Sequence, residues 1–296
     1  MIQYFLYKFC LFIIHCIPRP QAYRFGQFLA DRHYRNSNRD RVAVENNLRQ
    51  ILGADTDVHE KAREVFLNFG RYLVDFFLMY KMVDSLFVAD NVVVEGLHYL
   101  KEVEARGKGG IILTAHIGNW ELGGAVSAKL GYPLTVIALP HKERKVNILF
   151  NKQREAHGVT VIPANTAVRR CIEALRQNKF IAVVGDRDFG TFGEPLPFLG
   201  RMTLMPKGAA FFSYRTGAPI IPSFMIPQED GKYMMSYAAP IWPPEDSGGD
   251  GKDAIIALMK QCVAAIEAKI REYPTQWLMF REFGVEKEHL YPHSRA

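Results

Sequence analysis

The sequence lacks the features that would identify several common kinds of site. It has four cysteines in 296 residues, at positions 10, 16, 171 and 262, and none of them forms a C-x-x-C pair. This spacing provides neither a zinc ligand set nor a disulfide framework, and it fits a reducing compartment. There is also no H-E-x-x-H motif and no G-x-S-x-G elbow. We therefore expect no metal site, no cofactor and no serine nucleophile.

Long apolar runs are also scarce. The best candidate is residues 2–17, which are apolar except for Gln3, Lys8 and His15. As a helix this segment would span about 24 Å, which is short of the ~30 Å hydrocarbon core of a membrane. No small-residue cleavage site follows, so a secretory signal peptide is not indicated. A short spanning anchor, an anchor in the membrane plane and a buried amphipathic helix remain open, and we favour membrane attachment.

Acidic residues are outnumbered, at 31 Asp+Glu against 37 Lys+Arg, and the net charge is +6. Residues 19–49 contain seven arginines and three acids. If the apolar segment spans a membrane, these arginines keep the following chain cytoplasmic; if it lies flat, they can bind an anionic membrane surface. An ordinary basic helical surface is the simpler alternative. The chain has no zinc finger, RNP-like aromatic pair or basic heptad region, so no nucleic-acid partner is predicted.

Apolar runs alternate with helical patterns from residue 92 onward. This rhythm predicts an α/β fold, with a mostly parallel central sheet covered by helices on both faces. Residues 195–201 are too rich in proline and glycine for a regular element. We find no linker, so we expect an anchor at 1–18 and a single domain at 19–296. The expected strands are 92–96, 110–115, 135–139, 159–162, 180–184, 219–226 and 233–238, and the expected helices are 58–83, 97–106, about 119–130, 142–157, 167–177, 206–216 and 253–271.

The strand at 110–115 runs into a polar turn that contains the first candidate site. His116 lies in the turn, and Glu121 follows five positions later. If the next helix begins near Asn119, which is a fair N-cap, the Glu121 carboxylate can fold back toward the imidazole. A histidine oriented in this way is a general base for a hydroxyl group. The alternative is a structural or solvated His beside a Glu.

Further polar residues follow other strands, at the edge of the sheet where ligands bind in α/β proteins. Lys142, Arg144 and Arg154 lie on the expected helix 142–157, and they either bind phosphates or form a solvated helix face. Asp186 and Asp188 follow the strand at 180–184. They are expected to shape a substrate site or pair with arginines, because two acids alone do not make a divalent-cation site.

Taken together, these motifs resemble the lysophospholipid acyltransferase superfamily, and within it the bacterial lipid A late acyltransferases. The resemblance covers nearly the whole chain. One departure is Leu199, where the family usually has a second aromatic residue. The motifs that carry it are Asn47-Leu48, the H-x4-E pair His116/Glu121, Arg154-x3-Gly158, Asp186-x-Asp188-x-Gly190, Pro197-Phe198-Leu199-Gly200 followed by Thr203, and Pro274-x-Gln276-Trp277.

The resemblance implies a glycerolipid acyltransferase-like fold at the cytoplasmic face of a bacterial inner membrane. It implies transfer of a fatty acyl chain from a thioester, usually of acyl carrier protein and less often of coenzyme A, to a hydroxyl of a membrane lipid such as a lipid A precursor. His116 would act as the base and Glu121 would orient it. Another lipid acceptor, a thioester hydrolase and a membrane-bound binding protein remain alternatives. The residues expected to contact substrates are Asn119, Lys142, Arg144, Arg154, Asp186, Arg187 and Asp188.

Overall fold

A seven-stranded sheet forms the centre of the molecule in the computed structural model, which describes residues 2–138, 143–163, 166–188, 193–244 and 251–284, with side chains from residue 7. The strand order is β1-β9-β8-β2-β5-β3-β4. Only the β8–β9 pair is antiparallel among these pairings, so the predicted mostly parallel sheet is confirmed. The strands are β1 (Val92–Glu95), β2 (Gly110–Thr114), β3 (Leu134–Ala138), β4 (Thr160–Pro163), β5 (Phe180–Val184), β8 (Ile220–Pro227) and β9 (Tyr233–Tyr237).

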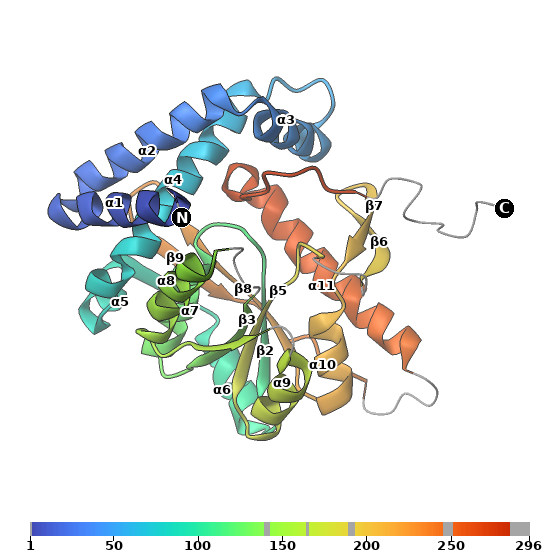
Figure 1. The fold of residues 1–296 in the computed structure, drawn as a ribbon. Coiled ribbons are helices and arrows are strands. Elements are labelled where there is room, and N and C mark those ends of the chain that lie inside the picture. Colours follow the sequence, from blue (N-terminus) through green and yellow to red (C-terminus); the bar gives the residue numbers. More distant parts are fainter. Residues whose placement is uncertain (1, 139–142, 164–165, 189–192, 245–250, 285–296) are drawn as a thin grey trace.

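Helices cover both faces of this sheet (Figure 1). Strand β2 shows why, because successive side chains of a strand point to opposite faces. Ile112 belongs to one hydrophobic core, and Ile111 and Leu113 belong to the other. The first core is closed by α4 (His59–Met82), α6 (Leu97–Ala105), α7 (Trp120–Lys129) and α8 (Arg144–Glu155), and the second by α9 (Ala167–Arg176), α10 (Gly208–Thr216) and α11 (Lys252–Glu272).

The N-terminal quarter of the chain is helical. It comprises α1 (Ile2–Cys16), α2 (Arg19–Asn36) and α3 (Asn38–Leu52), and a short helix, α5 (Ser85–Asn91), follows α4. Helices α2, α3 and α4 share a third hydrophobic core, which includes Leu48, Phe66 and Leu278. Within the described residues, no helix has both the length and the apolar character needed to cross a membrane.

The stretch 195–201 is not irregular, and that prediction is wrong. It forms most of an antiparallel hairpin of β6 (Glu194–Phe198) and β7 (Arg201–Met205). Each strand of a two-stranded ribbon has a free edge, where the missing N–H of a proline costs no ladder bond. Leu199 and Gly200 have φ angles of +48° and +82°, as a two-residue type I′ turn requires. Leu196 and Phe198 point inward and are buried.

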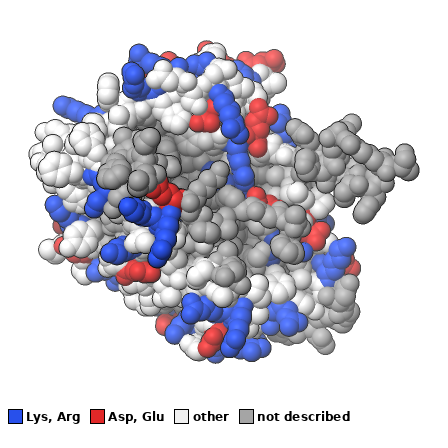
Figure 2. Space-filling model, in the orientation of Figure 1, with Lys and Arg blue, Asp and Glu red and all other residues white. Residues whose placement is uncertain are grey.

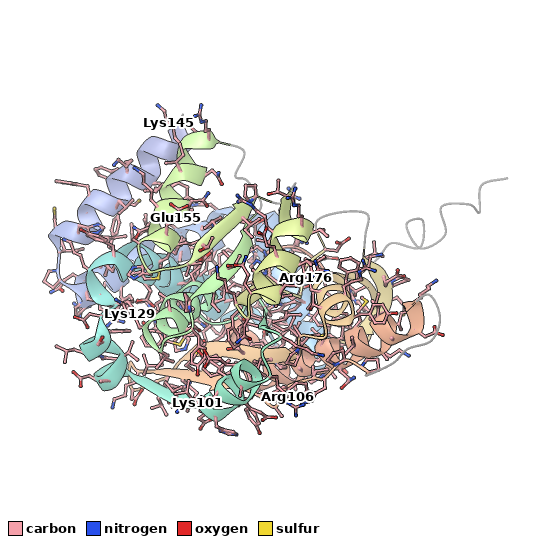
Figure 3. The ribbon with its side chains drawn as sticks, turned by 90° about the horizontal axis from the view of Figure 1, so that it is seen from below. Lys101, Arg106, Lys129, Lys145, Glu155 and Arg176 are labelled. Atoms are coloured by element: carbon pink, nitrogen blue, oxygen red, sulfur yellow. The ribbon has the colours of Figure 1, made fainter. Side chains whose placement is uncertain are left out.

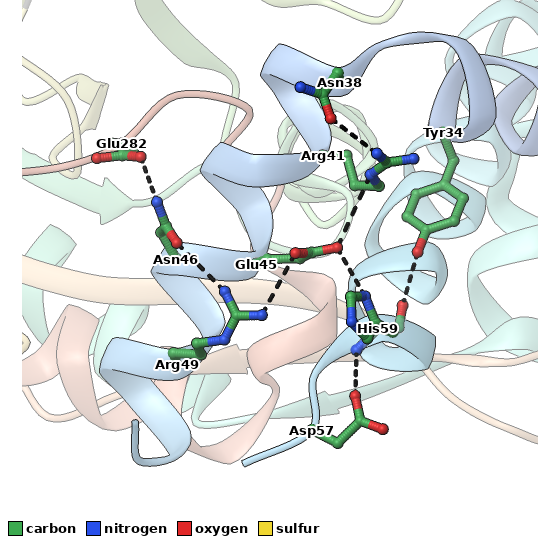
Figure 4. A network of polar contacts seen from close by, with 9 residues as sticks. All are labelled: Tyr34, Asn38, Arg41, Glu45, Asn46, Arg49, Asp57, His59 and Glu282. Carbon is green, nitrogen blue, oxygen red and sulfur yellow. Dashed lines mark hydrogen bonds and ion pairs between the residues drawn. The ribbon is translucent and has the colours of Figure 1, made fainter. Parts of the chain in front are cut away.

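The segment after α11 crosses back over the molecule and binds to α3. Asn47, at 3% exposure, donates from Nδ2 to the carbonyls of Met279 (3.2 Å) and Arg281 (2.9 Å), and its Oδ1 accepts from the N–H of Phe283 (3.4 Å). Next to it, buried Glu45 lies 3.0 Å from His59 and 3.5 Å from Arg49 (Figure 4). These contacts fix α3 against both the start of α4 and the C-terminal segment.

Replacing Asn47 with alanine is expected to destabilise the fold by about 2–4 kcal/mol, because buried backbone groups that lose a partner cost ~1–3 kcal/mol each. Denaturant unfolding of the two proteins measures this loss. Asn46→Ala is the matched control, since Asn46 is partly exposed and bonds to Glu282 at the surface. A loss for Asn47→Ala no larger than that for Asn46→Ala would contradict the clamping role.

Candidate active site

The turn after β2 is held in one conformation by its glycine and its helix cap. Gly118 has φ +58°, and a Cβ there would lie 2.2 Å from the carbonyl oxygen of Met225, so no other residue fits. Asn119 then caps α7, because its Oδ1 accepts the N–H of Leu122 at 3.1 Å. Asn119 is fully buried and does not line the cavity described below, which corrects its predicted contact with substrate.

A buried polar network holds the side chain of Asn119 in place. Asp75 on α4 accepts from Nδ2 of Asn119 (3.2 Å) and from the hydroxyls of Tyr233 (2.7 Å) and Tyr23. Arg19 lies 3.5 Å from the same carboxylate. Burial raises the pKa of Asp75, and these contacts oppose the rise. The network ties α2, α4 and β9 to Asn119, the residue that caps α7.

The imidazole of His116 contacts a carboxylate from the neighbouring strand. Its Nδ1 lies 2.7 Å from Oδ1 of Asp186, and the backbone N–H of His116 donates to Oδ2 at 3.1 Å. The indole N–H of Trp277 donates to the same Oδ2 at 2.9 Å. Strands β2 and β5 are parallel neighbours, so the residues after their carboxyl ends meet. Burial would raise the pKa of Asp186, but His116, Arg187 and Trp277 outweigh it and hold that pKa below its usual range.

Glu121 is engaged elsewhere, which corrects the predicted His116–Glu121 arrangement. Both of its carboxylate oxygens accept from Arg154 of α8, at 2.6 and 2.9 Å. The physical reason is that Glu121 lies in the first turn of α7, within reach of a guanidinium that binds a carboxylate through two parallel bonds. Burial would lower the pKa of Arg154, yet its pKa is raised because Glu121 stabilises the charge. Arg154 thus has its charge balanced by a carboxylate, and the carboxylate on Nδ1 of His116 is Asp186.

The C-terminal segment forms one side of the His116 turn. Ile117 and Trp277 form an antiparallel bridge, and the N–H of Leu278 donates to the carbonyl of His116 at 2.8 Å. The carbonyl of Leu278 accepts from the guanidinium of Arg187. The sequence singled out Trp277 as part of a motif, but it gave no sign that this residue reaches Asp186, which lies 91 positions earlier.

A cavity of about 700 Å³ adjoins these groups and runs between α7 and the sheet. Its ionisable lining residues are His116, Glu121, Arg154, Arg187 and Asp188. Helix α7 presents two glycines to it and so adds no side-chain bulk there. The rest of the wall is largely apolar and reaches the first residue of β3. That wall includes Met79, Ile112, Gly123, Gly124, Leu134, Val136, Ala182, Val184, Met225 and Met235.

Arg187 lines this cavity and contains an unsatisfied buried donor. Its Nε is buried and has no hydrogen-bond partner within the described ranges. Burial lowers the pKa of the guanidinium, and the neighbouring Asp186 opposes that shift. A buried N–H without a partner carries a free-energy cost, so this donor fits a ligand oxygen.

The three remaining residues that were predicted to contact substrate lie in different places. Asp188 lines the cavity, and its carbonyl accepts from Arg281 at 3.2 Å. Arg144 is exposed at the first residue of α8 and does not line the cavity. Lys142 lies outside the described residues. Over the described part of the chain, no cluster of three or more His, Cys, Asp or Glu could hold a metal ion.

Two features define what the arrangement can do chemically. A histidine with a carboxylate on Nδ1 keeps the proton on that nitrogen, which leaves Nε2 as the basic nitrogen. The adjoining cavity is apolar over most of its surface and is also lined by Arg187. This combination suits removal of a proton from a hydroxyl group beside a bound apolar chain.

Comparison with known proteins finds similarity to lipid acyltransferases. A family model described as bacterial lipid A biosynthesis acyltransferase matches residues 1–283. The phosphatidylinositol mannoside acyltransferase of Mycolicibacterium smegmatis is 27% identical over 269 residues, which is 88% of this chain and 85% of that protein. The lipid A biosynthesis palmitoleoyltransferase of Escherichia coli is 25% identical over 217 residues, covering 73% and 68%. A solved 1-acyl-sn-glycerophosphate acyltransferase of Thermotoga maritima has 16% identity and a TM-score of 0.40, covering 88% and 99%.

Proposed function

The chain belongs to the bacterial lipid A biosynthesis acyltransferase family, and on that premise we propose that it moves a fatty acyl chain from a thioester to a hydroxyl of a phosphorylated membrane glycolipid. The observation that carries this proposal is the His116–Asp186 pair beside the apolar cavity. The cavity holds the acyl chain, and the pair activates the hydroxyl. Attack on the thioester is direct, so no protein nucleophile is needed.

Each group near the histidine has a role in the proposed reaction. Nε2 of His116 takes the proton from the acceptor hydroxyl as its oxygen bonds to the thioester carbonyl carbon. Asp186 holds the ring's tautomer and stabilises the imidazolium, as the acid of a catalytic triad does. Nε of Arg187 donates to the carbonyl oxygen while negative charge develops there. The carbon–sulfur bond then breaks, and the carrier thiol leaves with the proton from the imidazolium.

The acceptor is one of two phosphorylated glycolipids. A lipid A precursor is our first candidate, because the family model bears that description. A phosphatidylinositol mannoside is the second, because the relative acting on that lipid matches more of the chain at higher identity than the Escherichia coli relative. In both cases the donor delivers an acyl chain to a hydroxyl of a lipid anchored in a membrane.

Incubation of the purified protein with an acyl thioester and each acceptor tests the proposal, with mass spectrometry of the lipids. We expect one acceptor to gain an acyl chain, and thiol release to depend on that acceptor. Equal thiol release with and without lipid would identify a hydrolase. The lipids of a strain lacking the protein, compared with the complemented strain, identify the physiological acceptor.

We further propose acyl carrier protein as the donor. Basic side chains gather over α8 and over α3 on the face in Figure 2, and acyl carrier proteins are acidic. Lys145 projects outward at the start of α8 (Figure 3), next to the exposed Arg144. Complementary charge raises the encounter rate and makes it sensitive to salt.

The double variant Arg144→Glu, Lys145→Glu is expected to raise KM for acyl carrier protein thioesters by ~3- to 10-fold and leave KM for coenzyme A thioesters nearly unchanged, because charge reversal slows a steered encounter. Kinetics with both donors across a salt series measure this effect. Arg176→Glu is the control, since Arg176 ends α9 on the other side of the sheet. The same KM change for both donors, or an equal change in the control, would refute the docking site.

We also propose attachment to the cytoplasmic face of a bacterial inner membrane. Phe9 and Phe12 on α1 are 61% and 68% exposed, and Phe28 on α2 is 63% exposed. The seven arginines of residues 19–49 lie in the two helices that follow α1. Exposed aromatics beside arginines are typical of a helix that lies in the membrane interface.

Deletion of residues 1–17 is expected to weaken attachment, and salt to weaken what remains. Tyr7 packs on Phe77 and Phe150, so the deletion also disturbs the core. The sharper variant is therefore the double substitution Phe9→Ser, Phe12→Ser. We expect it to lower binding to anionic vesicles by ~10-fold or more, because it removes apolar surface that the membrane would bury. Vesicle flotation measures binding, with Val168→Ser on α9 as the control. Unchanged flotation of the double variant would argue against attachment through α1.

A further inference from the structure

A second groove lies between the start of α3 and the C-terminal segment, apart from the cavity beside His116. Its volume is about 400 Å³, and it shares no lining residue with that cavity. Two exposed guanidinium groups belong to it, one from each side of the groove. We call it the α3 groove, and its lining includes Asn38, Arg39, Val42, Phe280, Arg281 and Glu282.

The acidic groups around the α3 groove have other partners. One oxygen of Asp40 lies 2.8 Å from Nε2 of His33. The carboxylate of Glu282 accepts from Nδ2 of Asn46 at 2.5 Å (Figure 4). Arg39, by contrast, has no hydrogen bond or ion pair to any residue in the described part of the chain. A guanidinium without a carboxylate partner favours an anionic ligand, and it binds carboxylate and phosphate best.

The α3 groove adjoins the active site through Arg281. Nη2 of Arg281 donates to the carbonyl of Asp188 at 3.2 Å, and Asp188 lines the cavity. Burial lowers the pKa of Arg187, and the nearby charge of Arg281 lowers it further, while Asp186 opposes both effects. The cations of the cavity and of the groove are therefore neighbours.

The distance from the α3 groove to the catalytic turn is short. The N–H of Leu278 donates to the carbonyl of His116 at 2.8 Å. Arg281 follows Leu278 by three residues, so their Cα atoms lie within ~11 Å, the most that three residues span. A single substrate with a sugar headgroup can therefore place an anionic group in the groove and a hydroxyl at the imidazole.

The α3 groove belongs to the helical layer that carries exposed apolar side chains. Phe280 in the groove packs edge-on to Phe66 of α4, with 4.9 Å between the ring centroids. Val42 on α3 is 40% exposed, and Phe28 on α2 is 63% exposed. Helices α1 to α4 lie on one side of the molecule in Figure 1. If this layer lies against the membrane as proposed, the headgroup of a membrane lipid reaches the groove.

The proposed reaction gives the donor a different place. Its acyl chain occupies the cavity between α7 and the sheet, and its carrier protein docks at Arg144 and Lys145 of α8. The α3 groove is lined by other elements, namely α3 and the C-terminal segment. This separation leaves the groove to the second substrate, the lipid acceptor.

We propose that the α3 groove binds the phosphate of the glycolipid acceptor through Arg39 and Arg281, and that this contact places the acceptor hydroxyl at His116. The proposal rests on the proposed function, in which the acceptor is a phosphorylated membrane glycolipid. Each guanidinium offers parallel N–H donors that match two phosphate oxygens. Because the two arginines come from opposite sides of the groove, they bind the phosphate between them.

The test is equilibrium binding of the full-length protein to glycolipids in phosphatidylcholine vesicles. Each of the two candidate acceptors is paired with a neutral glycolipid that has the same sugars and no phosphate. We expect one phosphorylated lipid or both to bind ~3- to 10-fold more tightly than the neutral partner, the range for an exposed charge-assisted hydrogen bond. Arg39→Gln and Arg281→Gln should each remove most of this preference. Arg39→Lys should keep part of it, because the charge remains.

The matched control is Arg24→Gln, since Arg24 is also an exposed arginine of residues 19–49 but does not line the α3 groove. It should retain the preference. Vesicles of phosphatidylcholine and phosphatidylglycerol measure the general attraction to anionic lipid. If Arg39→Gln weakens binding to these vesicles as much as binding to the phosphorylated glycolipid, the groove serves only membrane attachment and the proposal is wrong.

Equal binding of the phosphorylated and neutral lipids to the unaltered protein would also overturn the proposal, as would a preference that survives Arg39→Gln or is lost in Arg24→Gln. Acyl transfer to the same lipids, measured in parallel, tests the proposed function separately. A phosphate preference that depends on Arg39 without acyl transfer would contradict the proposed function and leave the groove as a phosphoglycolipid site. Acyl transfer with the same KM for both members of a pair would do the reverse.

Discussion

A His116→Ala variant is expected to lose acyl transfer by ~10²-fold or more in kcat, the usual scale for removing a general base. KM for the donor should change little, since the cavity and its cations are untouched. Steady-state kinetics with a saturating acceptor measure the loss. Trp120 packs edge-on to the imidazole at 4.9 Å, so unfolding temperatures of both proteins check that the turn stays intact.

The same variant separates catalysis from binding. If His116 acts only structurally, the variant should lose stability and donor affinity together with turnover. If it is the base, the folded variant still binds a thioether analogue of the donor, which cannot react, and fails only in transfer. Near-normal turnover by a folded His116→Ala protein would eliminate the mechanism, and with it the reading of this turn as an active site.

Replacing Asp186 with asparagine is expected to lower kcat by ~10³- to 10⁴-fold, the scale seen when a triad carboxylate becomes an amide. The amide nitrogen would donate to Nδ1 of His116, which forces the proton onto Nε2 and removes the base. Kinetics over a pH series measure this change. The loss should persist at every pH at which the unaltered protein is active, because an amide does not titrate. A kcat within ~10-fold of the unaltered protein would contradict the role of Asp186.

Stability gives an independent check on the same residue. The pKa of Asp186 lies below its usual range in the folded protein. Its carboxylate therefore stabilises the fold at pH values above the ordinary Asp pKa of ~3.9, and this contribution is lost as pH falls through the folded-state pKa. The free-energy difference between the unaltered protein and Asp186→Asn should thus be constant near neutral pH and shrink in acid.

Glu121→Gln is the matched comparison, because it also converts a carboxylate into an amide at the site. This change leaves the cation of Arg154 without its paired charge in the cavity wall, and an uncompensated buried charge is destabilising. We expect Glu121→Gln to lower the free energy of unfolding, and we expect Arg154→Gln to restore part of that free energy in the double variant. No second substitution should restore Asp186→Asn. This contrast distinguishes the carboxylate that orients the histidine from the one that balances an arginine.

Local patterns in the sequence predicted the seven strands of the central sheet and the helices that cover it, because each buried strand is a short apolar run and most of these helices have an apolar face. They did not predict which strands are neighbours. Asp186 contacts His116 because β5 lies beside β2, with β3 and β4 on the far side of β5. The sequence placed both residues after strand ends, but no local signal specifies the order of parallel strands joined by helices.

The error at Glu121 has a similar origin. Five residues of separation suggested a local pair with His116, on the expectation that His116 lies in the turn and the helix begins near Asn119. The competing partner, Arg154, is on a different helix, and the sequence indicated either phosphate binding or a solvated helix face for it. A bidentate ion pair between two helices depends on how those helices pack, which a single sequence does not reveal. Asn119 and the hairpin at 194–205 were misjudged for the same reason, since burial and edge position are properties of the assembled fold.

The docking of the C-terminal segment has a consequence for biosynthesis. When the ribosome has synthesised both sheets and α11, it has not yet synthesised Trp277 and Leu278. These two residues complete the hydrogen bonding of Asp186 and His116. Chains are synthesised from the N-terminus, at ~5–20 residues per second. Asn47 on α3 therefore lacks its hydrogen-bond partners in the C-terminal segment until that segment has been made. In a nascent chain, the strands of the sheet are therefore present before the contacts that hold His116 in place are complete. If the proposed function holds, acyl transfer is therefore expected only from chains that include Trp277 and Leu278.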